Sequence, residues 1–268
     1  MDRRDFLTAG KTKKATPVNP IAFASPTRTL SGINPYTGPW TVNEVIHLLK
    51  RTMFGAKKAD VDFFAAMSMN QAVDALLNVP LAQFTPAPPI KNYANSVDPA
   101  DPDNAIAAGQ TWVNINTNDG SVDSNRTNAY RNWWIGQMVN QNRNILEKMT
   151  LFWHNHFATE TDSIGRAIWC YQNNTVLRKN ALGNFKQFVK EMTTNTGMLR
   201  YQNGYLNTNT APDENYGREL QELFVVGKGA DNATQGYAEA DVKAAAKVLT
   251  GWQINGNTNT AVFTSNRH

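Results

Sequence analysis

Four side chains in two patterned stretches of the sequence are suited to bind a divalent metal ion. His154 and His156 lie in a densely apolar stretch, residues 144–158, and Glu219 and Glu222 lie in a later polar stretch. Histidine nitrogens and carboxylate oxygens together suit zinc, iron or manganese, so these residues are the candidate metal ligands of a metal-dependent enzyme. The four are not spaced as an H-E-x-x-H or E-x-x-H pair, so the ligands would come from separate helices.

Residues 144–158 are predicted to form a helix, with Asn144 as its N-cap and Glu147 returning the capping bond. At about 100° per residue, His156 falls in the middle of the apolar face, whereas His154 falls nearly opposite, beside Glu147. The two histidines can bind one ion only if the last turn unwinds. The simpler interpretation is that His156 is a buried imidazole bonded to a backbone carbonyl or a carboxylate.

The later polar stretch, residues 213–226, is also predicted to be a helix. Glu214, Arg218 and Glu222 follow one another at i,i+4 spacing, and Glu219 lies at the border of the buried side. Oppositely charged side chains four residues apart are neighbours on a helix surface. This pattern predicts a ladder of ion pairs, which is the alternative to a metal site for the same glutamates.

Three tryptophans are candidates for carbohydrate binding, namely Trp112, Trp133 and Trp134. Adjacent residues on a helix point in different directions, so Trp133 and Trp134 cannot both face inward, and an exposed ring can stack on a sugar. Nucleophilic hydrolysis has no support, because no G-x-S-x-G motif occurs. Cys170 has no evident partner, and a single cysteine excludes an intramolecular disulfide and a cysteine-rich zinc site.

The hydrophobic periodicity predicts a mainly α protein, a multi-helix orthogonal bundle with little β-structure near the C-terminus. Two capping boxes, Thr41 with Glu44 and Ser68 with Gln71, begin helices. The predicted helices cover about 41–53, 59–67, 68–79, 129–141, 144–158, 163–180, 184–197, 213–226 and 238–252, with a short one at 103–115. A turn and a strand at 261–264 follow the last helix.

The chain is expected to consist of an extended basic N-terminal arm, residues 1–40, and a helical domain, residues 41–268. Arg3 and Arg4 near the start resemble a twin-arginine export signal, although lysines follow where such a signal has apolar residues. Residues 79–125 hold six of the twelve prolines and five aspartates. This composition predicts an insertion that lies over the surface of the domain.

The overall composition limits the kinds of partner that the sequence indicates. The 268 residues carry a formal net charge of +4, which is too small to indicate a nucleic acid as partner. No run of about 18 apolar residues occurs, so no transmembrane helix is expected.

Five motifs occur in a fixed order along the chain. They read H-L-L-K-R-T-M-F-G at 47–55, M-T-L-F-W-H-N-H-F at 149–157, A-L-G-N-F at 181–185, E-N-Y-G-R-E-L-Q-E-L at 214–223 and Y-A-E-A-D-V-K-A-A-A-K-V-L-T-G-W at 237–252. In this order they resemble the bacterial family called domain of unknown function 1800. The resemblance covers about residues 41–268 apart from the insertion.

This resemblance implies a mostly helical bacterial protein, often with an export signal and often encoded beside a second uncharacterised secreted family, with no assigned activity. Two departures from the family pattern matter. Ala238 stands where the family usually has Thr, so the last helix is expected to lack its side-chain N-cap. Family members also continue past a motif resembling residues 266–268, so the chain is expected to be the N-terminal portion of a longer protein whose C-terminal part is a further partner.

Three functions remain open on the sequence alone. The first is an exported or envelope-associated protein, in the periplasm or cell envelope, that acts through a protein partner. The second is a metal-dependent enzyme with a divalent ion at His154, His156, Glu219 and Glu222. The third is a carbohydrate-binding protein, which requires a shallow groove lined by aromatic rings.

Overall fold

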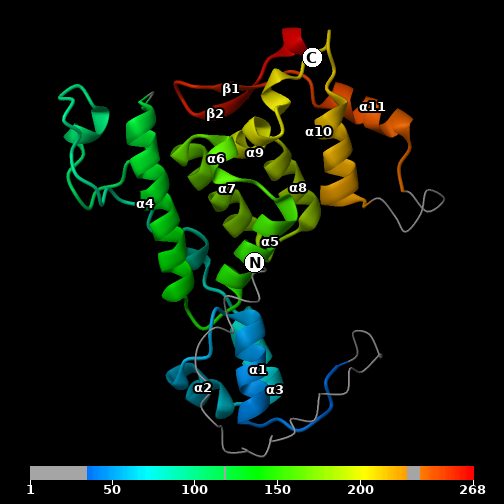
Figure 1. The fold of residues 1–268 in the computed structure, drawn as a ribbon. Helices are drawn as coiled ribbons and strands as arrows, with labels where there is room; N and C mark the ends of the chain where they lie inside the picture. The colour runs from blue at the N-terminus through cyan, green and yellow to red at the C-terminus, as the bar shows by residue number, and fades with distance from the viewer. Residues whose placement is uncertain (1–34, 118, 228–235) are drawn as a thin grey trace, which may run out of the picture. The chain divides into compact units, whose positions relative to one another are not determined.

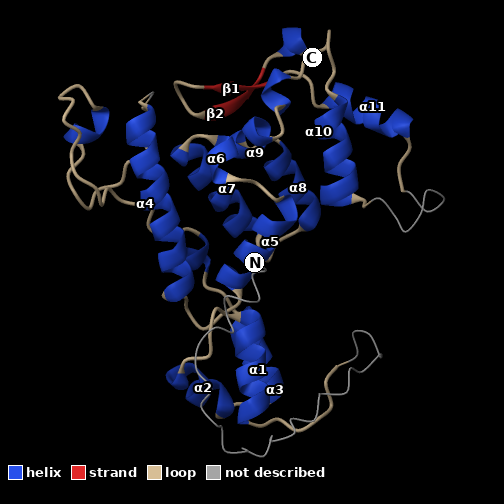
Figure 2. Cartoon of the chain, viewed as in Figure 1, coloured by secondary structure: helices blue, strands red, loops and turns tan. Residues whose placement is uncertain are grey.

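The computed structural model describes residues 35–117, 119–227 and 236–268 (Figures 1 and 2). The chain divides into two units, Met1–Gly38 and Pro39–His268, and the second unit holds every helix and strand given below. It is mainly helical, as the sequence predicted, with one two-stranded sheet among the described residues. Most of the predicted basic arm, including the twin-arginine-like start, lies outside the described residues.

Three short helices begin the second unit, namely α1 (Val42–Thr52), α2 (Lys58–Ala65) and α3 (Met69–Leu77). Both predicted capping boxes are confirmed. The backbone N–H of Thr41 donates to the Glu44 carboxylate at 2.9 Å, and that of Ser68 donates to Gln71 Oε1 at 2.9 Å. The apolar faces of these helices meet in a small core that includes Val45, Leu49, Phe64, Ala72 and Leu76.

The Pro- and Asp-rich stretch forms two 3-10 turns, η2 (Leu81–Phe84) and η3 (Pro102–Ala105). The prediction of a helix at 103–115 is wrong, because the chain forms only the 3-10 turn η3 there. Asp103 instead accepts a hydrogen bond from Arg126 Nε at 3.1 Å, and both side chains are buried. A buried charge needs a partner, so this ion pair fastens the stretch to the helix that carries Arg126.

That helix is α4 (Gly120–Val139), which begins nine residues before the predicted start. Asp119 is its N-cap and accepts hydrogen bonds from the backbone N–H groups of Ser121 and Val122 at 2.7 and 3.2 Å. A hydrogen bond from the Ser121 hydroxyl and, after it, these backbone bonds lower the pKa of the Asp119 carboxyl. The capping signal lies inside the stretch assigned to the insertion, which is why the periodicity of the apolar residues placed the start too late.

The middle of the unit contains five helices, α5 (Leu146–Phe157), α6 (Thr161–Ile164), α7 (Ala167–Asn180), α8 (Phe185–Thr193) and α9 (Thr196–Tyr201). The helix predicted at 163–180 is interrupted at Gly165, whose φ of 74° is left-handed and suits glycine. α7 lies among its neighbours α4, α5, α8 and α9 (Figure 1). It therefore connects the long helix α4 to the rest of the core.

The C-terminal part differs from prediction in two helices. The predicted last helix extends to Trp252, whereas the observed one ends at Val248 and Trp252 begins a strand. The helix predicted at 213–226 is an α-helix, α10 (Glu214–Glu219), that continues as a π-helix, η5 (Leu220–Val225). α11 (Glu239–Val248) crosses α10 at Gly217, where an added Cβ would lie 3.0 Å from backbone atoms of α11. This approach requires glycine at the crossing.

A small hairpin follows α11. Its antiparallel strands are β1 (Trp252–Asn255) and β2 (Thr260–Phe263), with a last 3-10 turn, η6 (Ser265–Arg267). As expected, Ala238 provides no side-chain cap for α11, and Asp241 accepts from the Ala238 backbone N–H at 2.8 Å. Within the described residues, no helix is both long and apolar enough to cross a membrane.

Candidate functional site

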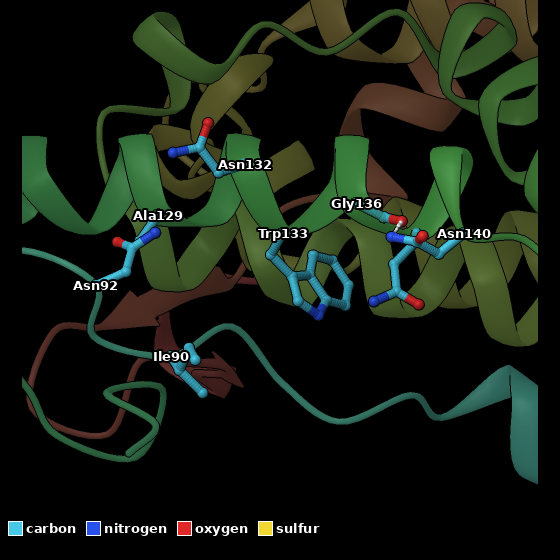
Figure 3. Close-up of a pocket in the computed structure, with 8 residues that line it drawn as sticks. Ile90, Asn92, Ala129, Asn132, Trp133, Gly136 and Asn140 are labelled. Carbon is cyan, nitrogen blue, oxygen red and sulfur yellow. Dashed lines mark hydrogen bonds between the residues drawn. The ribbon is translucent and has the colours of Figure 1, made fainter. Parts of the chain in front are cut away.

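Two adjoining pockets lie along the C-terminal half of α4, and we refer to them together as the α4 groove. The first has a volume of about 350 Å³ and the second about 200 Å³, and they share Gln137 and Asn140. In Figure 3, Trp133 projects from α4 on the side where the segment with Ile90 and Asn92 runs. The groove is therefore formed by one face of α4 and by the Pro-rich stretch that the buried Asp103 ion pair holds in place.

Most polar side chains of the α4 groove are carboxamides. They are Gln83, Asn92, Asn132, Gln137, Asn140, Gln141, Asn142 and Asn144. Asn132 and Gln137 lie on α4, and Asn140 is its C-cap, three residues after Gln137. Each carboxamide offers both donors and an acceptor without a net charge, so the groove is suited to ligands with many neutral hydroxyl or amide groups.

Several of these carboxamides are not used by the fold. Asn140 donates to the Gly136 carbonyl at 3.0 Å (Figure 3), and Asn144 donates to Gln83 at 2.6 Å. By contrast, no described residue hydrogen-bonds to the side chain of Gln137, nor to those of Asn92 and Asn132. Gln141 Oε1 is buried and has no partner among the described residues. An unpaired buried acceptor costs free energy, which a ligand would recover.

Trp133 forms one wall of the first pocket with a ring that is held in place. Its Nε1 donates to the Ala87 carbonyl at 2.7 Å. Its ring stacks on Tyr130 with centroids 6.1 Å apart and meets Tyr171 edge-on at 5.6 Å. The side chain is half-buried, so one part of a fixed aromatic surface remains available to the pocket.

A buried ion pair lies beneath the second pocket. Glu147 lines this pocket, and Arg178 of α7 donates to Glu147 Oε2 at 2.9 Å, with 1% of the arginine side chain exposed. The guanidinium also lies 5.7 Å from the Trp133 ring centroid. Glu147 is the only charged side chain among the described residues lining the groove, and Arg178 neutralises it.

The expected role of Glu147 as a capping partner is therefore wrong. Asn144 does accept from the Leu146 backbone N–H at 3.1 Å, but the N-cap of α5 is Ile145. Glu147 instead pairs with Arg178, which is 31 residues away in the sequence. The only sign of this pair in the sequence is a charged residue in each of two apolar helical stretches, which does not say which charges meet.

The two candidate histidine ligands lie against aromatic rings. His156 is half-buried, and its Nε2 lies 2.8 Å from the Phe224 carbonyl oxygen. A carbonyl only accepts, so this bond places the hydrogen of a neutral ring on Nε2, as the simpler interpretation predicted. His154 lies edge-on to Trp134 with centroids 4.9 Å apart, and burial lowers the pKa of the His154 imidazole.

The candidate glutamates lie at the junction of α10 and η5. Glu219 ends α10, and Glu222 accepts from the Tyr237 hydroxyl at 2.8 Å. No group of three or more His, Cys, Asp or Glu residues in the described ranges is arranged to hold a metal ion. Assignment of a metal to His154, His156, Glu219 and Glu222 therefore stays a prediction.

The predicted ladder of ion pairs needs correction. The Glu214–Arg218 step is present as an ion pair of 4.0 Å, but Arg218 makes two hydrogen bonds of 2.7 Å to Glu239 of α11. Glu222 binds Tyr237 rather than forming the second step of the ladder. Arg218 pairs more closely with Glu239 than with its i,i+4 neighbour because two parallel hydrogen bonds to one carboxylate are stronger than a single long contact.

Two other residues that the sequence analysis weighed are buried. Trp112 is completely buried in the core with Tyr130 and Ile168, so it cannot stack on a sugar, and that expectation is wrong. Cys170 is also buried, and burial raises the pKa of its thiol to about 12. A thiol with so high a pKa stays protonated at neutral pH and is a poor nucleophile.

The described residues thus define a mainly helical protein with a neutral, amide-lined groove. Over residues 47–268 the chain matches the family described as Protein of unknown function (DUF1800). Because the match covers most of the chain, the protein belongs to this family, which confirms the resemblance of its five motifs. Neither the curated proteins nor the solved structures provide a match.

Proposed function

We propose that the protein binds a neutral carbohydrate in the α4 groove. The observation that carries the proposal is the fixed Trp133 ring at the wall of a pocket whose polar lining consists of carboxamides. A sugar ring presents C–H groups on its faces, which pack on an aromatic ring. Its hydroxyls donate and accept at its edges, as do the carboxamides of Asn92, Asn132 and Gln137.

The charge of the groove supports a neutral ligand. Glu147 is paired with Arg178, and the other lining residues are uncharged. The volume of the first pocket lies at the lower end of the range of about 300–1,000 Å³ that is typical of ligand sites. This size and the adjoining second pocket favour a short part of a longer glycan.

The proposal is tested with neutral soluble polysaccharides and their oligosaccharides, by affinity electrophoresis and titration calorimetry. We expect Trp133→Ala to weaken binding by about tenfold or more, since a buried Trp anchor contributes about 2 kcal/mol. Trp252→Ala is the matched control, because this half-buried tryptophan lies in β1, outside the groove. Asn132→Ala provides a milder second variant. Equal binding by the wild type and Trp133→Ala would refute the proposal.

We also propose that the protein acts in the periplasm or cell envelope, as the family resemblance implies. Polysaccharides are abundant there, which agrees with a glycan ligand. Cell fractionation tests this proposal, with variants in which Arg3 and Arg4 are replaced by lysine. Recovery of the wild-type protein in the cytoplasmic fraction alone would contradict it.

A protein partner in the envelope is the second candidate function, and one exposed surface favours it. Phe152 of α5 is 54% exposed, and Phe185 of α8 is 37% exposed. Between them, Trp153 stacks on Phe185 with centroids 5.5 Å apart. Contiguous exposed apolar side chains often mark interaction sites. Under this candidate, Phe152→Ser reduces cross-linking to an envelope protein, whereas Trp133→Ala does not.

A metal-dependent enzyme is the remaining alternative from the sequence. Elemental analysis of the purified protein by mass spectrometry tests it directly. Near-stoichiometric zinc, iron or manganese that is lost in His156→Ala would support it. Absence of metal from wild-type protein purified without chelators, with His156→Ala only lowering the melting temperature, would make His156 a structural residue.

A further inference from the structure

A third pocket with a different chemistry lies at the N-terminal end of α7, near the C-terminal hairpin. It has a volume of about 300 Å³, and its charged lining residues are Arg166 and Arg200. The rest of the lining is uncharged and consists of Ile164, Gly165, Trp169, Tyr205, Ile254 and Gly256. We call it the arginine pocket. None of these described lining residues is acidic. The ion-paired arginines of α4, α7 and α10, by contrast, each have a carboxylate beside them.

Arg200, in the last turn of α9, is not neutralised by the fold. Its guanidinium donates to the Tyr205 hydroxyl and lies 5.2 Å from the centroid of the same ring. No described carboxylate forms an ion pair with it. A guanidinium held by neutral groups keeps its full charge and its remaining N–H donors.

Arg166, at the N-cap of α7, brings a second guanidinium to the pocket. It donates to the Thr117 carbonyl and lies 5.2 Å from the Trp169 ring centroid. The nearby acidic group is Asp123, whose carboxylate accepts from the Ala167 backbone N–H at 3.1 Å and does not line the pocket. Burial raises the pKa of the Asp123 carboxyl, and the Ala167 bond and the charge of Arg166 oppose this rise. Asp123 therefore offsets part of the charge of Arg166 but does not fill the site.

The hairpin that contributes Ile254 and Gly256 to the pocket is held by specific hydrogen bonds. Asn259, in the hairpin turn, accepts from Trp169 Nε1 at 3.1 Å and donates to Asn116 at 3.1 Å. Asn116 in turn donates to the Gly256 carbonyl at 2.9 Å. These bonds join three segments that are far apart in sequence. The pocket is therefore shaped before any ligand arrives, which reduces the ordering cost of binding.

We propose that the arginine pocket binds a small ligand with a carboxylate or phosphate group, independently of glycan binding in the α4 groove. Guanidinium groups form paired, charge-assisted hydrogen bonds to the oxygens of both groups. Trp169 and Tyr205 lie against the two guanidinium groups, and the N–H groups of Arg200 that do not bond to Tyr205 are offered to the ligand. The small volume favours a compact anion over a nucleic acid or an extended peptide.

Titration calorimetry with malonate and with inorganic phosphate tests this proposal, and malonamide serves as the uncharged analogue of malonate. We expect saturable binding of at least one anion and none of malonamide. Arg200→Gln is expected to weaken anion binding by about tenfold or more, because one charge-assisted hydrogen bond accounts for about that factor. The relative strength of the two anions shows whether the pocket prefers a planar or a tetrahedral group.

The matched control is Arg51→Gln, which removes the same charge from an exposed position in the last turn of α1. Its anion binding is expected to equal that of the wild type. Arg166→Gln tests the same pocket from α7 in case Arg200→Gln does not fold, as judged by circular dichroism. Absence of saturable binding by the wild type, or an equal loss in Arg51→Gln, would overturn the proposal.

Discussion

The arginine pocket lies at the N-terminal end of α7, the α4 groove lies near its C-terminal end, and the two differ in how an arginine is used. Beneath the groove, Arg178 is 1% exposed and paired with Glu147. In the arginine pocket, Arg200 has only Tyr205 as a described partner. Each pocket also has a tryptophan in its wall, Trp133 in one and Trp169 in the other. The two regions therefore differ mainly in whether a carboxylate meets the guanidinium.

This difference shows that the partner decides the role of an arginine. A buried ion pair fills space and carries no net charge, so the groove above it is left to neutral hydrogen bonding. A guanidinium with only neutral contacts keeps a positive potential at the pocket and attracts anions. The same side chain is thus structural in one region and available to a ligand in the other.

The largest expected effect is on the buried pair. Arg178→Ala is expected to lower the free energy of unfolding by about 3–5 kcal/mol, because it leaves the Glu147 carboxylate buried without a partner. Urea denaturation measures this change. Replacing both residues, as Glu147→Leu with Arg178→Met, should cost less than the single change. If Arg178→Ala costs no more than Arg51→Ala on the surface of α1, the pair does not support the groove.

The next largest effect is the selective loss of one ligand in each of two variants. Trp133→Ala is expected to weaken glycan binding by about tenfold or more and leave anion binding unchanged, while Arg200→Gln does the reverse. The reason is that no residue lines both sites. Calorimetry on both variants with both ligands measures it. A loss of both ligands in either variant would show that the two regions are coupled.

A smaller, severalfold effect is expected from salt. Raising sodium chloride from about 0.05 to 0.5 M shortens the Debye length from about 14 to 4 Å. Anion binding near Arg200 should weaken severalfold, whereas glycan binding in the neutral groove should stay constant. Potassium fluoride at the same ionic strength controls for specific chloride binding. Salt-sensitive glycan binding would contradict the neutrality of the groove.

Tyr205→Phe is expected to weaken anion binding by about two- to fivefold. The phenol oxygen accepts from Arg200, and its loss leaves the guanidinium less well oriented while the charge remains. Calorimetry with malonate measures the change, and Tyr201→Phe, which does not line the pocket, is the control. An unchanged affinity would show that the Tyr205 hydroxyl does not position Arg200.

The smallest effect concerns the pH dependence of stability near the groove. Burial lowers the pKa of His154, which packs on Trp134 of α4. The folded state therefore binds fewer protons than the unfolded state, so the free energy of unfolding falls as the pH decreases below about 6.5. His154→Gln should flatten this dependence between about pH 7 and 5, as measured by urea denaturation. An equally steep dependence in the variant would show that another group is responsible.

Local signals in the sequence predicted much of the fold. The capping boxes at Thr41 and Ser68 are confirmed, because a cap joins groups only two or three residues apart. The mainly helical class and the family are confirmed for the same reason, since periodicity and motifs are read along the chain. The carboxamides and Trp133 were visible as residues, but not as a groove.

Only the tertiary structure decided which distant residues meet. Glu147 pairs with Arg178 rather than capping α5, and Arg218 pairs with Glu239 rather than extending a ladder along its own helix. Such pairs form where packing brings two helices together. The Glu147–Arg178 pair is also shielded from water, whereas the Arg218–Glu239 pair is exposed and gains from two parallel hydrogen bonds. The sequence by itself determined the helices and the family. Packing determined that one arginine is neutralised and that Arg200 is not.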